Sequence, residues 1–353
     1  MGNELATRRD ANLELYRIIL MLFIIAHHYV VNSGVIEVMR METVSAKSLF
    51  LYFFGAWGKT GINCFVLITG YYMCQSNVSI KKFLKLFLQI KFYAIGIYFI
   101  FLVTGYESFS IMGLFDALIP IRMIETNFTN CFEMFYLIIP VLNRLVKNME
   151  KKQHEYLLLI LGFVYIFLGT FRQVTFNYFS WFIVLYFIAS YIRLYPRKIF
   201  DKKVTWGGIS LALIIAGCCS ITFMVVIEKG TYFFVSDSNT FIAVGLGISS
   251  FLYFKNIQLK YNKIINNIAS ATFGIFLIHT ISDTMRRWLW KDILNVSGFY
   301  AANTMSAVVV HAILSVFGIF IVCMILDKLR ERFIERPVFL YLSRFEWINK
   351  KIE

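Results

Sequence analysis

The residues best suited to chemistry in this chain lie on its first apolar run, Arg17 to Asn32 (RIILMLFIIAHHYVVN). At about 100° per residue, the eleven-residue step from Arg17 to His28 is about three helical turns, which puts both side chains on one face about 16 Å apart. Asn32 falls within about 40° of that face, whereas His27 points about 80° away from it. Titratable side chains in a membrane helix are costly, usually face the bundle interior and indicate function. The run predicts a functional polar stripe that includes His28.

Imidazole titrates near neutrality, so His28 is a candidate general base or nucleophile. A histidine that packs against a neighbouring helix and bonds to it is the structural alternative. His279 and His311 fall at a similar depth in two later apolar runs. Three imidazoles at one level are also typical of a metal site. Only Glu133 could add a carboxylate near that depth, and the sequence therefore predicts no metal.

Two basic residues extend this candidate site. Lys59 stands in a glycine-rich break within an apolar run, GAWGKTG. Non-helical backbone at membrane depth occurs where it is buried in protein or lines a wet cavity, which favours a site-lining lysine over a loop that dips from the surface. Arg17 could hold a phosphate or carboxylate through its planar donor fork. Snorkelling towards the inner membrane surface is the commoner explanation for such an arginine.

Composition indicates the elements that must position these residues. Apolar residues make up 59% of the 353 residues and charged residues 16%, and the mean hydropathy is +0.67. Soluble domains carry about a quarter charged residues. The long apolar runs exclude the weakly alternating pattern of a membrane β-barrel. We therefore predict an all-α polytopic membrane protein, and the six cysteines show no spacing typical of a disulfide or metal framework.

Apolar runs divide the chain into about ten predicted transmembrane helices. These lie at 14–33, 49–74, 84–104, 129–146, 155–171, 178–195, 206–228, 239–254, 264–283 and 303–327. Residues 1–16 are expected to form an amphipathic interfacial helix with Leu5, Leu13 and Tyr16 facing lipid, and 1–13 are its interfacial segment before the first span. Residues 109–124 are expected to form an interfacial or re-entrant piece. Residues 328–353 are expected to form a cytoplasmic or interfacial tail. The whole chain, 1–353, reads as a single transmembrane domain.

The net charge of +14 comes from basic clusters that recur between alternate apolar runs. This distribution follows the positive-inside rule and indicates topology, not a nucleic-acid partner. Six basic segments on one side of ten spans place both termini in the cytoplasm. Arg17 then lies at the inner face, whereas His28 and His279 lie in the outer half of the bilayer.

Residues 14–28 (ELYRIILMLFIIAHH) resemble the first-helix motif of the acyltransferase-3 family of integral membrane acyltransferases. In that motif an arginine and a histidine are separated by ten residues, which selects Arg17 and His28. The resemblance continues in order along nearly the whole chain. It includes GINCFVLITGY (61–71), YLIIPVLNRLV (136–146), SWFIVLYFIASYIRLY (180–195) and IASATFGIFLIHT (268–280). Many members have an arginine-rich stretch at the start of the third span, where this chain has only lysines.

The resemblance implies transfer of an acyl group, commonly acetyl from acetyl-CoA, to hydroxyls of surface glycans, peptidoglycan or lipids across the bacterial membrane. His28 would be the catalytic histidine and Arg17 its motif partner. We expect acyl-CoA as cosubstrate without a bound cofactor, a surface polysaccharide or its lipid-linked precursor as acceptor, membrane lipids as surroundings, and a multi-pass location in the cell membrane. The sequence leaves a homo-oligomer open.

The remaining polar residues divide between donor and acceptor sides. The expected donor-binding residues are Lys59, Asn63, Lys81, Lys82 and Lys85; the supporting residues on the acceptor side are His279, Glu133 and Asn32. His28 could act as general base on the acceptor hydroxyl or carry the acyl group transiently. The alternative function is a transporter or exporter that uses the polar stripe as a substrate or proton path. The absence of repeated halves counts against the commoner transporter architectures.

Overall fold

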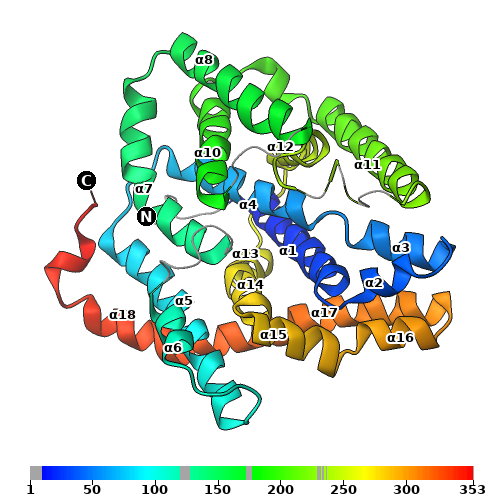
Figure 1. The fold of residues 1–353 in the computed structure, drawn as a ribbon. Helices are drawn as coiled ribbons and strands as arrows, with labels where there is room; N and C mark the ends of the chain where they lie inside the picture. Colours follow the sequence, from blue (N-terminus) through cyan, green and yellow to red (C-terminus); the bar gives the residue numbers. More distant parts are fainter. Residues whose placement is uncertain are drawn as a thin grey trace.

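The computed structural model describes residues 10–119, 128–171, 177–228, 232, 234, 235 and 237–352. Within these ranges the chain is helical, and one isolated bridge between Ser79 and Lys351 is the only β-type pairing. The predicted all-α class is confirmed. Helices enclose the first one, α1 (Ala11–Val31), which packs against α4 (Gly58–Met73), α14 (Thr272–Thr280) and α17 (Met305–Arg330) (Figure 1).

The other helices complete the bundle around these four. They are α2 (Val35–Arg40), α3 (Ala46–Phe54), α5 (Ile80–Val103), α6 (Ile111–Leu118), α7 (Phe128–Asn148), α8 (Lys151–Leu161), α9 (Gly169–Phe171), α10 (Tyr178–Leu194), α11 (Lys203–Val226), α12 (Phe241–Lys255), α13 (Lys263–Ala269), α15 (Asp283–Arg287), α16 (Val296–Ala302) and α18 (Arg336–Leu342). A π-helical stretch, Gly162–Leu168, joins α8 to α9. Another, Trp288–Ile293, follows α15.

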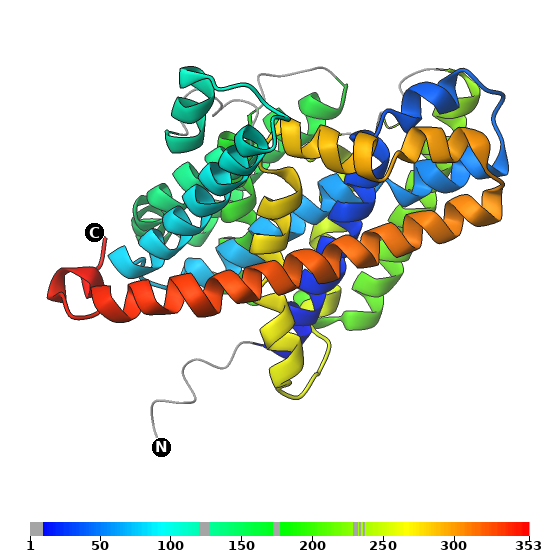
Figure 2. The same ribbon diagram turned by 90° about the horizontal axis from the view of Figure 1, so that it is seen from below.

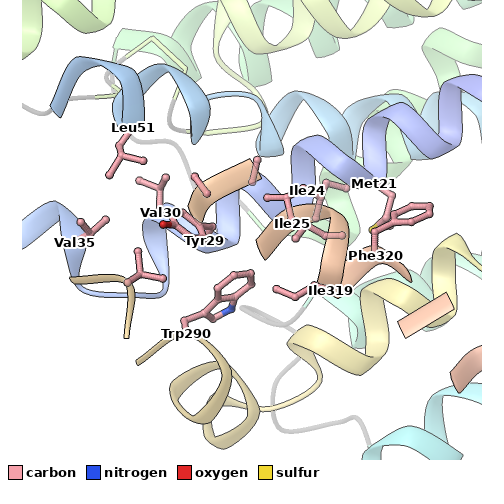
Figure 3. Packing of buried hydrophobic residues seen from close by; sticks show 14 of the residues in the cluster. Met21, Ile24, Ile25, Tyr29, Val30, Val35, Leu51, Trp290, Ile319 and Phe320 are labelled. Atoms are coloured by element: carbon pink, nitrogen blue, oxygen red, sulfur yellow. The ribbon is translucent and has the colours of Figure 1, made fainter. Parts of the chain in front are cut away.

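Two apolar cores hold the bundle together. One surrounds the C-terminal half of α1, where Met21, Ile25 and Tyr29 face Phe320 of α17 and Trp290 (Figure 3). The other joins α4, α7, α10 and α12. Lipid tails are as apolar as leucine, so such cores stabilise helix association by close packing, with small residues at the contacts.

The basic connections of the chain share one face of the bundle. Four hydrogen bonds join neighbouring connections there: Tyr72 to Asp10 (2.7 Å), Arg193 to Gln75 (2.9 Å), Lys255 to Asp201 (2.9 Å) and Ile352 N–H to Val78 C=O (2.8 Å). The start of α1 and α13 lie at this end, and α2 and α6 lie at the opposite end (Figure 2). We call these ends the basic face and the opposite face. That the basic face and both termini are cytoplasmic stays a prediction.

Each of the ten predicted spans overlaps one or more described helices, but fewer of these are long and apolar enough to cross a membrane. Six helical segments of the described chain satisfy that test, and the pair Lys263–Thr280 and Asp283–Ala302, bent by 87°, could add a seventh. The predicted spans at α7, α10 and α12 do not satisfy it. α10 and α12 have only 17 and 15 residues, whereas a crossing takes about 20. A polytopic helical membrane protein is therefore established, and the count of ten stays a prediction.

The second predicted span is broken where its glycines stand. α3 begins at a capping box, in which the Ser45 hydroxyl accepts from the Ser48 N–H, and it ends at Phe54. α4 starts at Gly58, after the break at residues 55–57. The Gly55 carbonyl, which the break frees from the helix, forms a hydrogen bond with the His27 side chain.

The N-terminal end of the chain differs from the sequence-based expectation, whereas the cytoplasmic or interfacial location of the tail, 328–353, stays a prediction. Leu13 and Tyr16 are buried in protein and do not face lipid, while residues 1–9 lie outside the described ranges. At the other end α17 continues as a helix through Glu331–Glu335 into α18, so the tail begins as part of a 38-residue helix, Met305–Leu342. This helix runs obliquely across the bundle (Figure 2).

Candidate active site

A cavity of about 400 Å³ opens beside the C-terminal half of α1. Its size is within the range of small-molecule sites, about 300–1,000 Å³. We call it the His28 cavity. The polar side chains that line it are His27, His28, Asn32, Lys59, Thr129, Tyr178, Thr280, Asp283 and Arg286.

His28 is held by His279, the histidine predicted at the same depth. His28 Nδ1 lies 3.1 Å from His279 Nε2, and His279 Nδ1 lies 2.6 Å from the Ile275 carbonyl oxygen. A carbonyl only accepts, so His279 Nδ1 carries the proton; in a neutral imidazole its Nε2 then accepts from His28 Nδ1–H. These tautomers follow from the bonding pattern. The arrangement leaves the lone pair of His28 Nε2 available for a substrate proton.

The protein fixes His279 more tightly than His28. His279 is fully buried on the last turn of α14, edge-on to Phe276 and Trp290. The bond to the Ile275 carbonyl spans four residues of the same helix, so backbone geometry sets its orientation. A rigid hydrogen-bonded neighbour that fixes the tautomer of a functional histidine is a common supporting device.

The structure also brings His27 to the cavity, although helical phase predicted that it points away from the stripe. Its Nδ1 donates to the Gly55 carbonyl at 2.6 Å, a group freed by the break between α3 and α4. A Cβ at Gly58 would lie 2.3 Å from His27 Cβ, so only glycine permits this approach. The reason for the difference is tertiary: the broken span folds over α1 and widens the lined surface beyond one helical face.

Lys59 occupies the position predicted for a site-lining lysine. It follows Gly58 at the start of α4, and its Nζ donates to the Tyr178 hydroxyl at 2.6 Å. The ammonium also lies 5.3 Å from the centre of the Tyr178 ring. The broken helix thus places a cation in the cavity wall and gives it a neutral partner.

Asn32 stands where α1 ends, one turn after His28. Its backbone N–H caps the helix by bonding to the His28 carbonyl at 3.0 Å. Its side-chain Nδ2 is buried and has no hydrogen-bond partner among the described residues. An unmade buried hydrogen bond costs about 1–3 kcal/mol, so this donor on the cavity wall has bonding capacity that a ligand oxygen could use.

Sequence reasoning did not select Tyr178, Thr280, Asp283 or Arg286. Asp283 and Arg286 form an ion pair on the wall of the cavity near the opposite face. The mixed charge of residues 283–292 was the available signal, since other connections on that face carry little basic charge. Tyr178 and Thr280 gave no signal, because a hydroxyl at a helix end is common.

Arg17 lies three turns below His28 and does not line the His28 cavity. Its guanidinium pairs with Glu14 at 3.1 Å, and the Glu14 side chain is almost fully buried. The sequence contained this carboxylate at the (i, i+3) position of ELYR, where it faces the arginine on a helix. The polar stripe therefore has an ion pair at its N-terminal end and the histidine pair at its C-terminal end.

Several predicted site residues lie elsewhere. Asn63 is fully buried, donates to the Ser238 carbonyl at 2.6 Å and accepts from Trp181 Nε1 at 2.8 Å, so it joins helices and does not line the cavity. Glu133 pairs with Lys91 at 3.5 Å, not with a histidine. The lysines at the start of α5 lie on the basic face, outside the cavity: Lys81, Lys82, bonded to the Asn77 carbonyl, and Lys85, paired with Glu335.

His311, the third histidine of matching depth, belongs to the core. Its Nδ1 bonds to the Tyr29 hydroxyl at 2.8 Å, and its ring stacks on Phe299. Across the described ranges no group of three or more His, Cys, Asp or Glu side chains is arranged to hold a metal. Of the three histidines of matching depth, His28 and His279 therefore form a pair, and His311 makes separate contacts with Tyr29 and Phe299.

A second hollow flanks α1 on the side of Phe23. This apolar groove of about 580 Å³ lies between α1, α4, α11 and α12 and reaches from Lys203, on the basic face, to Trp57 and Thr60. The Thr60 hydroxyl is buried without a hydrogen-bond partner in the described chain. Thr60, at this end of the groove, directly follows Lys59 in the sequence.

Comparison with known proteins bears on this geometry. The acyltransferase domain family matches residues 10–328 of the chain, which include α1, the broken span and the His28–His279 pair. Searches of curated proteins and of solved structures gave no match. The matched region covers most of the chain, and its helices make it a multi-pass membrane protein. The chain thus belongs to the acyltransferase-3 family and is a membrane acyltransferase.

Proposed function

We propose that this protein transfers an acyl group, most simply acetyl, from cytoplasmic acyl-CoA to a hydroxyl of a cell-surface glycan or its lipid-linked precursor in the cell membrane. The observation that best supports this proposal is the chain of two hydrogen bonds that links the Ile275 carbonyl to His279 and His279 to His28. It orients an imidazole lone pair into a cavity large enough for a sugar ring. A membrane acyltransferase needs such a base for an alcohol acceptor.

In the proposed step, His28 Nε2 takes the proton of the acceptor hydroxyl while its oxygen attacks the thioester carbonyl carbon. A carbon–oxygen bond forms, the carbon–sulfur bond breaks, and the leaving thiolate receives the proton from His28. The His28 imidazolium that forms in between is stabilised through its bond to His279. No other reactant is needed, because the thioester itself drives the transfer.

The oxygen of the thioester carbonyl gains negative charge during this attack and needs fixed donors. The Lys59 ammonium and the unpartnered Asn32 amide lie on the walls of the same cavity as His28. Both are donors held by the protein before substrate arrives. They supply the oxyanion stabilisation in this proposal, and Lys59 keeps the donor-side role expected from the sequence.

The donor would approach from the basic face. CoA is a polyanion, and Lys203 stands at the basic-face end of the apolar groove, which reaches Trp57 and Thr60 at its other end. Arg17 and the lysines at 81, 82 and 85 add cationic charge on that face. The acceptor would enter from the opposite face, past Asp283 and Arg286.

The test is acyl transfer by the purified full chain in lipid nanodiscs, with labelled acetyl-CoA and the glycan fraction of the host membrane. Mass spectrometry of surface glycans from cells with and without the chain gives the second readout. We expect label in glycan with the native chain and none with His28→Ala. His311→Ala is the matched control, since it removes a histidine of similar depth outside the cavity.

Two results would contradict the proposal. Normal acetylation by His28→Ala would remove the base from the mechanism. A native chain that neither binds acetyl-CoA nor transfers its label, yet moves a solute across the nanodisc or vesicle membrane, would instead support the transporter alternative.

A further inference from the structure

His27 lines the His28 cavity, yet the proposed acyl transfer gives it no role. It precedes His28 on α1, and the centres of the two imidazole rings are 5.7 Å apart. Both side chains are half-buried. An imidazole this close to the proposed base can contact the same substrate molecule. The edge of the His27 ring that faces the cavity therefore decides what it recognises.

Two glycines of the broken span determine which edge of the His27 ring is free. The Gly55 carbonyl accepts the Nδ1 proton at 2.6 Å. A Cβ on Gly58 would lie 2.3, 2.4 and 2.7 Å from His27 Cβ, Cγ and Cδ2, so the backbone at Gly58 covers that side of the ring. The edge formed by Cε1 and Nε2 is left to line the cavity. Within the described chain Nε2 has no hydrogen-bond partner and is not buried.

His27 and His28 thus present the same chemistry to the cavity. In each neutral ring Nδ1 carries the proton, which the Gly55 carbonyl accepts from His27 and His279 accepts from His28. These tautomers follow from the bonding pattern. Each Nε2 then has a lone pair that accepts one hydrogen bond and donates none. Two such acceptors on one wall match a ligand with two O–H donors.

A sugar ring supplies two such donors, because it carries hydroxyls on neighbouring carbons. One hydroxyl can reach His28 Nε2 while the next reaches His27 Nε2. A carboxylate or a phosphate dianion has no proton to offer to these lone pairs. Lys59 and Asn32, by contrast, are N–H donors on the same wall and suit the thioester oxygen. The cavity thus has acceptors for the sugar and separate donors for the acyl group.

We infer that His27 binds the acceptor sugar by accepting a hydrogen bond from the hydroxyl next to the one that is acylated, so that the cavity recognises a vicinal diol. This inference rests on the proposed glycan acylation and narrows its acceptor to sugars whose acylated carbon adjoins a carbon with a free hydroxyl. The bond to His27 holds the reacting hydroxyl at His28 Nε2. His27 takes no part in the proton transfer itself.

The test uses the full chain in lipid nanodiscs with methyl glucoside and its monodeoxy derivatives at carbons two, three, four and six. NMR titration without acyl-CoA measures binding in the absence of turnover, and the labelled carbon is mapped after transfer from acetyl-CoA. His27→Asn keeps an N–H for the Gly55 carbonyl but has no acceptor at the place of Nε2. His27→Gln is the converse variant, since its amide oxygen reaches that place while the Gly55 carbonyl loses its donor. His311→Ala, outside the cavity, is the matched control.

We expect label on carbon two, three or four, each of which adjoins a carbon with a free hydroxyl. In the native chain, removal of one neighbouring hydroxyl should weaken binding about five- to tenfold, as for one hydrogen bond between neutral groups. In His27→Asn the same removal should change binding by less than about twofold, because the bond is already absent.

The remaining derivatives and variants sharpen this expectation. Methyl glucoside without its hydroxyl at carbon six keeps every vicinal pair and should bind each chain as the parent does. His27→Gln should retain part of the native preference for the intact diol. His311→Ala should retain all of it.

Four results would overturn the inference. They are label on carbon six, which adjoins no free hydroxyl; no binding of methyl glucoside by the native chain; equal weakening by removal of the neighbouring hydroxyl in the native chain and in His27→Asn; and a raised KM for acetyl-CoA in His27→Asn with native binding of the sugar, which would assign Nε2 to an N–H of the donor. Failure of the proposed function looks different. In that case the native chain would bind the glucosides with the preference that depends on His27 but would transfer no label to them.

Discussion

Two regions of this protein bury polar groups at membrane depth, and they do so differently. In the His28 cavity, the Asn32 amide is buried without a partner in the described chain, and the bonding pattern leaves His28 Nε2 open. The other region lies between α5 and α17 near the basic face. There Asp327 accepts from Gln89 (3.1 Å), Tyr93 (2.9 Å) and Arg330 (3.0 Å), while Glu335 accepts from Arg330 (2.8 Å) and pairs with Lys85 (2.6 Å).

We call this second region the Asp327 network. As far as the described chain extends, no buried nitrogen or oxygen of its side chains lacks a partner. A Cβ on Gly274 would lie 2.1 Å from the Asp327 carboxylate, so α14 accommodates the network only with glycine there. Fully satisfied polar networks rigidify and position helices, whereas unused hydrogen-bonding capacity on a cavity wall is what a substrate can use. Burial of charge alone therefore does not identify a functional site.

The largest expected effect is on catalysis in the His28 cavity. His28→Ala should lower the rate of acyl transfer by about 10²- to 10⁴-fold, the usual contribution of a general base. The free energy of unfolding should fall by no more than about 1–3 kcal/mol, the cost of leaving the buried His279 Nε2 without its hydrogen bond. Label transfer per folded molecule measures the effect. A parallel loss of folded protein would show that His28 belongs with the structural group.

Asp327→Ala should lower the stability of the folded chain and leave the acyl-transfer rate per folded molecule unchanged. Removing the carboxylate leaves the Arg330 guanidinium, 7% exposed, with Glu335 alone and strands the Gln89 and Tyr93 donors, which together should cost about 3–5 kcal/mol. The free energy of unfolding from a denaturant titration measures this loss. Asp201→Ala, which removes an exposed partner of Lys255, should cost at most about 1 kcal/mol. Lost turnover in the remaining folded Asp327→Ala molecules would give the network a catalytic role.

His279→Ala should reduce the acyl-transfer rate about 10- to 100-fold, as for other residues that orient a functional group. His279→Gln should restore part of it, because the side-chain oxygen can still accept from His28 Nδ1–H. The pH dependence of kcat/KM should shift in His279→Ala but not in His311→Ala. An unchanged profile in His279→Ala would separate this histidine from the base.

The smallest effect is expected for Asn32. Asn32→Ala removes one donor to a substrate oxygen and should lower the rate about tenfold, the worth of one hydrogen bond of about 1–1.5 kcal/mol. The stability of the folded chain should not fall, since Nδ2 has no partner in the described protein. The acyl-transfer rate and the midpoint of denaturant unfolding of Asn32→Ala together test this prediction. A stability loss without a rate change would assign Asn32 to helix capping alone.

Part of the site could be predicted from sequence because it depends on one helix. The step from Arg17 to His28 is three turns of α1, and helical phase alone puts both on one face. Glycines around Lys59 predicted a broken span, which the structure contains. Depth counted from the predicted span ends matched His28 with His279, and their 3.1 Å contact agrees with it. In each case local periodicity carries the information.

Helical phase and depth gave wrong predictions for residues whose surroundings depend on contacts between helices. They placed His311 with the other histidines, although Tyr29 and Phe299 hold it in the core. They placed Asn63 on the donor side, although Trp181 and the Ser238 carbonyl use its amide. They excluded His27, which the broken span brings to the cavity. Depth fixes a level in the bilayer but not the direction in which a side chain points.

By itself, the sequence determined the helical membrane class, the face that carries the basic connections and the central position of the Arg17–His28 stripe, because hydropathy and charge are local properties of the chain. The tertiary structure alone decided which nitrogen of His28 is open, which polar groups remain without partners and where the cavities lie. These depend on how α14 and α4 meet α1, and no periodicity within one helix encodes such contacts.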